Sequence, residues 1–218
     1  MAKYYIAAFF VLLSLYVSSG HCSQLQTVDG KIHISIGYSS GCFFVQIFMH
    51  QVQQTFERYN KYVDMEFIPW GRTMRAPNGS LVCQFGEPDC FANRVQRCAL
   101  TLLEGDQAAQ VRFVLCEFRE PFPAFRQRSL ACAQAAGLNI QALDFCVSTS
   151  FGDSLEGPFQ ERARLGMDFY NRIPHVVFNG VPVLDHHIDV FHRGLRTVVC
   201  EALRNDPTTS VTSCAGDW

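Results

Sequence analysis

The chain has 218 residues, 48% of them hydrophobic, and a formal net charge of −2 at pH 7. A net charge this close to zero favours neither nucleic acid nor an acidic membrane surface as a general partner, so we expect no nucleic-acid binding. The apolar content suffices for a sizeable buried core, and the length suits one domain that carries an insertion.

The first 20 residues predict a secretory signal peptide. Lys3 supplies the positive charge, residues 6–17 form the apolar core, and Ser18-Ser19-Gly20 offers a cleavage site of small residues. The apolar run is too short to cross a bilayer, and no later segment approaches the length of a membrane span. We therefore expect a soluble chain of residues 21–218, located in the extracellular fluid or the endolysosomal lumen.

The segment from 32 to 60 predicts a strand, a turn and a helix. Ile32, Ile34 and Ile36 recur at a spacing of two, and apolar residues then follow a helical spacing from Phe44 onward. Cys42 falls at the start of this helix, where unpaired N–H groups and the positive end of the helix dipole stabilise a thiolate. We interpret Cys42 as a candidate nucleophile.

The order of the remaining elements predicts a thioredoxin-like fold. Residues 63–68 form a second strand, which the right-handed crossover rule makes parallel to the first. Residues 173–184 contain two short apolar runs joined by Asn179-Gly180, which is a strong hairpin signal, and Asp185 is expected to cap one last helix. Between these parts the chain predicts only short helices, at 91–103, 107–118, 124–136, 140–146 and 157–170.

We therefore expect an α/β protein: a single thioredoxin-like domain of residues 21–218, with a disulfide-stapled helical insertion at about 84–170. This fold gives Pro174 a specific meaning, because a cis-proline precedes its third strand and faces the active turn. The alternative is an ordinary trans-proline, the usual state of the bond, since only about 5% of such bonds are cis. The predicted order of elements favours the cis form.

Ten cysteines in a chain with a signal peptide indicate a disulfide framework. The sequence does not give the pairing, although Cys132 and Cys146 flank a predicted turn and could staple a helical hairpin. If Cys42 is free, at least one more cysteine must be free or pair with another chain, and Cys22 and Cys214 near the termini are the candidates for a disulfide-linked dimer. The structural cysteines are then Cys83, Cys90, Cys98, Cys116, Cys132, Cys146 and Cys200.

Two further polar motifs have functional interpretations. Asn78 begins the one N-glycosylation sequon of the chain, in a polar connection that we expect to be an exposed loop. Residues 185–189, Asp-His-His-Ile-Asp, together with His192 suggest metal ligands, but a helix cap followed by an exposed face is the favoured interpretation. We expect no metal and no cofactor.

One cysteine-rich segment carries a family resemblance. Residues 83–98 read CQFGEPDCFANRVQRC and resemble C-Q-H-G-x-x-E-C followed by x-x-N-x-x-x-x-C, the signature of the gamma-interferon-inducible lysosomal thiol reductases and their insect relatives. Phe85 stands where the family has histidine, and Asp89 where it has glutamate. The resemblance implies a thiol reductase with C-x-x-C at the active turn. Carried over by position, the nucleophile is Cys42 and the resolving residue is Val45.

Val45 in place of the second cysteine leaves two possible functions, since valine cannot attack a mixed disulfide. The first is a family member with impaired dithiol reduction that binds a protein or a cell surface. The alternative is a monothiol oxidoreductase that reduces or isomerises disulfides of protein substrates through Cys42. In both cases Phe43 and Phe44 place two large rings beside the cysteine. They could form an exposed patch with Phe48 and Trp70, but phenylalanines at helical spacing more often belong to the core.

Overall fold

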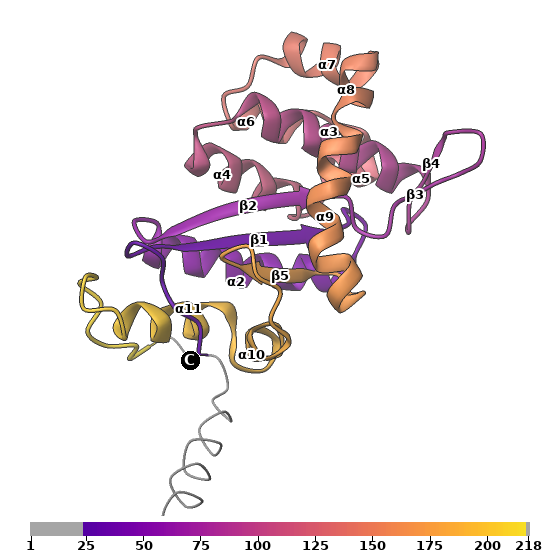
Figure 1. The fold of residues 1–218 in the computed structure, drawn as a ribbon. Helices are drawn as coiled ribbons and strands as arrows, with labels where there is room; N and C mark the ends of the chain where they lie inside the picture. Colours follow the sequence, from indigo (N-terminus) through magenta and orange to yellow (C-terminus); the bar gives the residue numbers. More distant parts are fainter. Residues whose placement is uncertain (1–23, 217–218) are drawn as a thin grey trace, which may run out of the picture.

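The computed structural model describes residues 24–216. The predicted signal peptide and Cys22 lie outside the described residues. Figure 1 shows a small central sheet, a group of helices beyond one edge of it, and a C-terminal pair of helices on the other side. Within the described residues, no helix is both long and apolar enough to cross a membrane.

Three strands form the central sheet in the order β2-β1-β5. Strand β1 (Ile32–Tyr38) runs parallel to β2 (Val63–Pro69), with Ile32 opposite Val63, and the two are joined through helix α2 (Phe43–Tyr59). Strand β5 (His175–Phe178) pairs antiparallel to the other edge of β1. The predicted strand-helix-strand unit and its parallel pairing are therefore confirmed.

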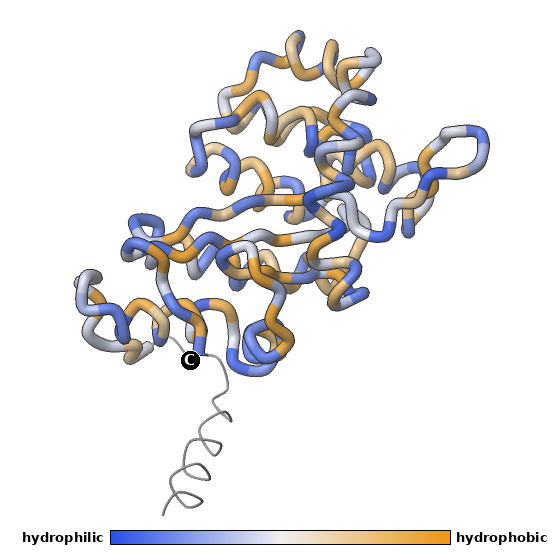
Figure 2. The backbone as a smooth tube through the Cα atoms, viewed as in Figure 1, coloured by the Kyte–Doolittle hydropathy of each residue, from blue (hydrophilic) through white to orange (hydrophobic). Residues whose placement is uncertain are grey.

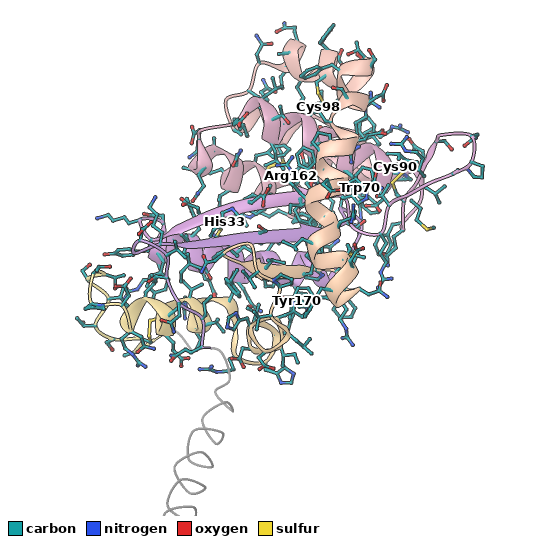
Figure 3. The ribbon with its side chains drawn as sticks, in the orientation of Figure 1. His33, Trp70, Cys90, Cys98, Arg162 and Tyr170 are labelled. Carbon is teal, nitrogen blue, oxygen red and sulfur yellow. A yellow bond between two sulfur atoms is a disulfide. The ribbon has the colours of Figure 1, made fainter. Side chains whose placement is uncertain are left out.

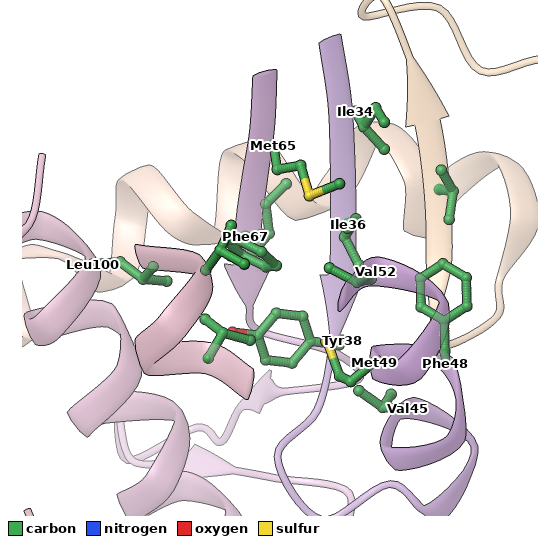
Figure 4. Packing of buried hydrophobic residues seen from close by; sticks show 14 of the residues in the cluster. Ile34, Ile36, Tyr38, Val45, Phe48, Met49, Val52, Met65, Phe67 and Leu100 are labelled. Atoms are coloured by element: carbon green, nitrogen blue, oxygen red, sulfur yellow. The ribbon is translucent and has the colours of Figure 1, made fainter. Parts of the chain in front are cut away.

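The core fills both faces of this sheet, because helices cover both. All but one of the β1 side chains are buried, and Val45, Phe48 and Val52 of α2 pack beneath them (Figure 4). Helix α9 (Glu156–Tyr170) crosses the opposite face in contact with all three strands. Figure 2 shows the apolar residues gathered along the strands and the facing helices. This double burial explains why β1 is a nearly continuous buried run rather than an alternating one.

Between residues 87 and 170 the described chain contains helices alone. The predicted helix at 124–136 is two short helices, because Arg128 adopts a left-handed conformation with φ of 51°. The sequence interpretation also missed a two-stranded ribbon, β3 (Met74–Arg75) and β4 (Leu81–Val82), which projects from the body (Figure 1). The helices are α3 (Glu87–Leu102), α4 (Gln107–Glu117), α5 (Pro123–Gln127), α6 (Ala131–Ala135), α7 (Ile140–Ser148), α8 (Ser150–Ser154) and α9.

The C-terminal part departs from three predictions, the first of them only in part. The hairpin after β5 is confirmed only as a turn: Asn179 and Gly180 both have positive φ, and the Val181 N–H donates to the Phe178 carbonyl at 3.0 Å in one antiparallel bridge. The second strand does not form, and the chain enters α10 (Leu184–Arg193). The single last helix is also wrong, because Gly194, with φ of 91°, separates α10 from α11 (Leu195–Arg204). The N-cap of α10 is Val183, so Asp185 lies in the first turn and does not cap the helix.

Eight cysteines pair within the chain. The disulfides are Cys83–Cys90, Cys98–Cys146, Cys116–Cys132 and Cys200–Cys214. The predicted staple between Cys132 and Cys146 is therefore wrong, since each pairs with a different helix. Cys214 is also wrong as a candidate for an interchain bond, because it closes a loop with Cys200.

Candidate functional site

Cys42 ends a short turn at the carboxyl end of β1, and we call residues 39–42 the thiol turn. Cys42 is the N-cap of α2: its carbonyl oxygen accepts the N–H groups of Val45 at 3.1 Å and Gln46 at 3.2 Å. It is the one free cysteine among the described residues, and its side chain is only 4% exposed. The thiol therefore lies at a helix start, as predicted, but beneath the surface.

Val45 occupies the position three residues after the thiol. Its side chain is fully buried in the core below the thiol turn, close to Phe48 and Met49 (Figure 4). The position that carries the second thiol in a C-x-x-C turn is thus closed to solvent and apolar.

Two side chains from the start of α3 hold the backbone of the thiol turn. The carboxylate of Asp89 accepts the Ser39 hydroxyl at 2.6 Å, the Gly41 N–H at 3.0 Å and the Phe85 N–H at 3.3 Å. The side-chain oxygen of Asn93 accepts both the N–H and the hydroxyl of Ser40, at 3.0 and 2.7 Å. Asp89 and Asn93 are both fully buried. The signature segment thus makes hydrogen bonds to Ser39, Ser40 and Gly41, the three residues before Cys42.

Two aromatic rings lie against Gly41, the residue before the thiol. A methyl group on Gly41 would lie 2.7 Å from the Phe85 side chain and 2.8 Å from the Phe125 ring, so only glycine fits there without a shift. Phe85 belongs to the loop closed by Cys83–Cys90, and Phe125 belongs to α5. Together they cover the turn from the side of the helical insertion.

Helix α5 is itself positioned by a buried acid, Glu117 at the end of α4. One carboxylate oxygen of Glu117 accepts the Ala124 N–H at 3.0 Å, and the other has no partner. Burial raises the pKa of Glu117 to about 7, although the Ala124 hydrogen bond lowers it. The hydroxyl of Tyr38, the last residue of β1, is also buried without a partner, and burial followed by the nearby Glu117 charge raises its pKa.

The corner after β2 lies against the thiol turn, because a methyl group on Gly71 would lie 2.7 Å from the Ser39 side chain. Trp70 is buried, and the Arg97 guanidinium lies 5.4 Å from its ring while donating to the Pro69 carbonyl at 3.2 Å. Burial lowers the pKa of Arg97 to about 10, so it stays charged at neutral pH. Figure 3 shows Trp70 and Cys90 at this end of the sheet, between the strands and the projecting ribbon.

The Ile173-Pro174 bond is cis, as predicted. His175 follows it and pairs with Gly37 of β1, so Pro174 lies at the same end of the sheet as the thiol turn. Its contact with Cys42 stays a prediction. The His175 ring is 1% exposed, its Nδ1 donates to the Arg172 carbonyl at 3.1 Å, and burial lowers its pKa to about 4.

The aromatic residues near the thiol divide into two groups. Phe43 and Phe44 are 64% and 69% exposed and meet edge to face at 6.0 Å between ring centres. Phe48 and Trp70, by contrast, are buried, as the core alternative predicts, whereas Phe43 and Phe44 form the exposed part of the four-residue set. Ile47 extends the exposed group by one turn of α2. We call Phe43, Phe44 and Ile47 the apolar rim.

One of the three histidines of α10, His187, departs from the predicted exposed face, whereas His192 is exposed. His187 is 5% exposed, stacks on Tyr170 at 4.2 Å and accepts the Val176 N–H at 3.4 Å. Among the described residues, no group of three or more histidine, cysteine, aspartate or glutamate side chains is placed to hold a metal ion. His187 serves the packing of the sheet edge.

Sequence reasoning missed the roles of Asp89 and Asn93. Both belong to the signature segment, which was the available signal, but their partners lie about 50 residues away. Only the packing of α3 against the end of β1 brings the two segments together.

Comparisons with known proteins agree with this architecture. A family model described as gamma interferon inducible lysosomal thiol reductase matches residues 33–136, which include the thiol turn and the signature segment. The gamma-interferon-responsive lysosomal thiol protein of Arabidopsis thaliana is 24% identical over 159 residues, 72% of this chain and 65% of that protein. This match therefore spans less than two thirds of the relative's length.

Among solved structures, oxidised BdbD from Bacillus subtilis is similar, with a TM-score of 0.53 and 12% identity. The likeness covers 83% of this chain and 89% of BdbD. At this identity it bears on the fold alone, and it confirms the predicted thioredoxin-like class.

Proposed function

We propose that this chain, as a member of the gamma interferon inducible lysosomal thiol reductase family, has two properties. It is impaired in dithiol reduction, and it binds a protein or a cell surface. Family and fold together support a thiol-oxidoreductase-like protein. The single observation that carries the finer proposal is Val45, fully buried where a dithiol reductase has its second thiol.

The missing second thiol affects the release of the substrate from the mixed disulfide and not the first attack on the substrate disulfide. A thiolate at Cys42 that attacks a substrate disulfide forms a mixed disulfide and expels the other substrate sulfur as a thiolate. In a C-x-x-C turn the second thiolate then displaces the first, an intramolecular step favoured by a high effective concentration. With valine there, release needs an external thiol, so turnover is slow.

The burial of Cys42 and the exposure of the apolar rim support a binding role. The thiol is covered, whereas the Phe43 and Phe44 rings beside it are largely in solvent. Because about two thirds of each ring is exposed, covering it with an apolar partner segment would contribute about 1–2 kcal/mol before the costs of ordering are counted. The partner we propose is a protein or cell-surface ligand that presents such a segment.

A monothiol oxidoreductase is the second candidate. The observation in its favour is the free cysteine at the N-cap of α2, where a helix start favours a thiolate. Its substrates would be proteins that carry disulfides, with an external thiol completing the cycle. No cofactor is needed for either function.

Disulfide reduction with a limiting small thiol separates the two candidates. We expect low turnover for the wild type, none for Cys42→Ser, and a clear rise for Val45→Cys, whose smaller side chain fits the buried site. A wild-type rate equal to that of a C-x-x-C relative, and abolished in Cys42→Ser, would replace the binding proposal with the monothiol enzyme.

Binding is tested with a permanently unfolded, thiol-blocked polypeptide as the probe, since it offers apolar segments but no disulfide. Wild type and Cys42→Ser should bind it equally, while Phe43→Ser combined with Phe44→Ser should weaken binding. The matched control replaces Phe145 and Phe151, an exposed pair on α7 and α8, with serine. Equal loss in the control pair, or no binding by the wild type, would contradict a binding role for the apolar rim.

Three further proposals concern glycosylation, location and a disulfide-linked dimer. Asn78 is exposed in the turn between β3 and β4, which supports its use as a glycosylation site; an endoglycosidase should lower the mass of the wild type but not of Asn78→Gln. The signal peptide and the family name support a secreted or endolysosomal location. With Cys214 paired, a disulfide-linked dimer would use Cys22, and a non-reducing gel of Cys22→Ser tests it.

A further inference from the structure

The buried carboxylate of Asp89 is the contact through which the signature segment holds the thiol turn. It is 0% exposed and receives three hydrogen bonds from two separate segments. Two come from the thiol turn, from Ser39 and Gly41, and the third comes from Phe85, whose ring also covers Gly41. One side chain therefore joins the turn before Cys42 to the loop that covers it.

These hydrogen bonds to a buried carboxylate hold the thiol turn in one conformation. A carboxylate that accepts backbone N–H groups makes stronger hydrogen bonds than a neutral acceptor. If the carboxylate is removed, the Gly41 N–H, the Ser39 hydroxyl and the Phe85 N–H lose their acceptor, and buried donors without acceptors are costly. The turn and its cover would then rearrange to reach other acceptors or water.

We propose that Asp89 is a positioning residue for the Cys42 thiol: its carboxylate holds the thiol turn against α3 and the Cys83–Cys90 loop, and so keeps the thiol buried. Asn93 supports the same arrangement through Ser40. The proposal deepens the proposed function, because it concerns the same thiol. Its test measures thiol accessibility and not activity, so the two can fail independently.

The test is the rate at which a maleimide labels Cys42 in the native, non-reduced protein, followed by mass spectrometry of the Cys42 peptide. Asp89→Ala should raise the rate by about tenfold or more, because losing buried hydrogen bonds shifts a local opening equilibrium by that order. Asp89→Asn should raise it only about threefold, since the amide oxygen can still accept from Gly41 while the Phe85 N–H loses its acceptor.

The dependence of the labelling rate on urea distinguishes local opening of the thiol turn from a general loss of stability of the whole protein. Local opening of the turn exposes little surface and gives a shallow dependence, whereas global unfolding gives a steep one. The control is Thr55→Val, which removes a buried hydrogen bond to the Gln51 carbonyl in the middle of α2. It should leave labelling in the absence of urea nearly unchanged.

Unchanged labelling in Asp89→Ala, or a rise with the steep urea dependence of global unfolding, would overturn the proposal. If Asp89→Ala does not fold, Ser39→Ala removes one of the three donors and should raise the rate about threefold. No rise in Ser39→Ala relative to Thr55→Val would equally overturn it.

Discussion

Replacing Glu117 with glutamine tests whether the carboxyl group behind α5 is protonated in the folded protein. The side chain is 3% exposed, and one of its oxygens has no partner. Glutamine has the same shape and can still accept the Ala124 N–H. The substitution therefore removes the titration and keeps the contact.

The sign of the effect follows from the pKa. Burial raises the pKa of Glu117 from 4.5 to about 7, so the folded chain binds this proton more tightly than the unfolded chain does. The resulting stability is fully present below about pH 4.5 and is lost as the pH rises through about 7. At about 1.4 kcal/mol per pKa unit, the difference between 4.5 and about 7 corresponds to about 3.5 kcal/mol.

Glutamine does not titrate, so Glu117→Gln should keep this stability at neutral pH. Relative to the wild type, the variant should gain about 3 kcal/mol in free energy of unfolding between about pH 4 and pH 8. The assay is urea unfolding of both proteins across this range, with the disulfides intact. Glu120→Gln, an exposed carboxylate three residues away, is the control and should show little change. Parallel curves for wild type and Glu117→Gln would refute the reasoning.

Three other perturbations have defined outcomes. His175→Gln should reduce the loss of stability in acid, because burial lowers the pKa of His175 from 6.5 to about 4. In the wild type this group contributes stability above about pH 6.5, and about 3 kcal/mol of it is lost by about pH 4, which urea unfolding measures. Gly37→Ala should destabilise by about 3 kcal/mol or more in thermal unfolding, since its methyl group would lie 2.0 Å from the His175 ring, whereas Gly157→Ala, with nothing within 4 Å, should not. Replacing Cys200 and Cys214 together by serine should cost about 3 kcal/mol, because the bond closes a loop across a sequence separation of 14 residues; a loss below about 1 kcal/mol would contradict the loop-entropy estimate.

The part of the fold set by local patterns was predictable from the sequence. The alternating isoleucines, the helical spacing after Cys42 and the strand at 63–68 encode the parallel unit, and the order of elements led to the cis state of Pro174. These features depend on the period of the apolar residues and on the connection rule, both of which a single sequence displays.

Features that depend on distant partners were not predictable. The signal at Asn179-Gly180 gave the turn, but the second strand stops at Val181 because the outer edge of β5 has another partner, the His187 ring that accepts the Val176 N–H. Pro182 also cannot donate to a strand ladder. The Cys98–Cys146 bond joins residues 48 apart, and the Asp89 and Asn93 contacts depend on how α3 docks on the sheet.

The placement of the disulfides also determines how the chain would respond to proteolysis. Among the described residues, no disulfide spans the stretch from 147 to 199, because three close within residues 83–146 and the fourth joins Cys200 to Cys214. A cut between Cys116 and Cys132 would leave the pieces covalently joined, whereas a cut at the exposed Asn171 or Arg172 would not. The C-terminal fragment, with β5, α10 and α11, would then stay in place only through strand pairing and helix packing. Such a cleaved protein would give two bands on a denaturing gel even without reductant.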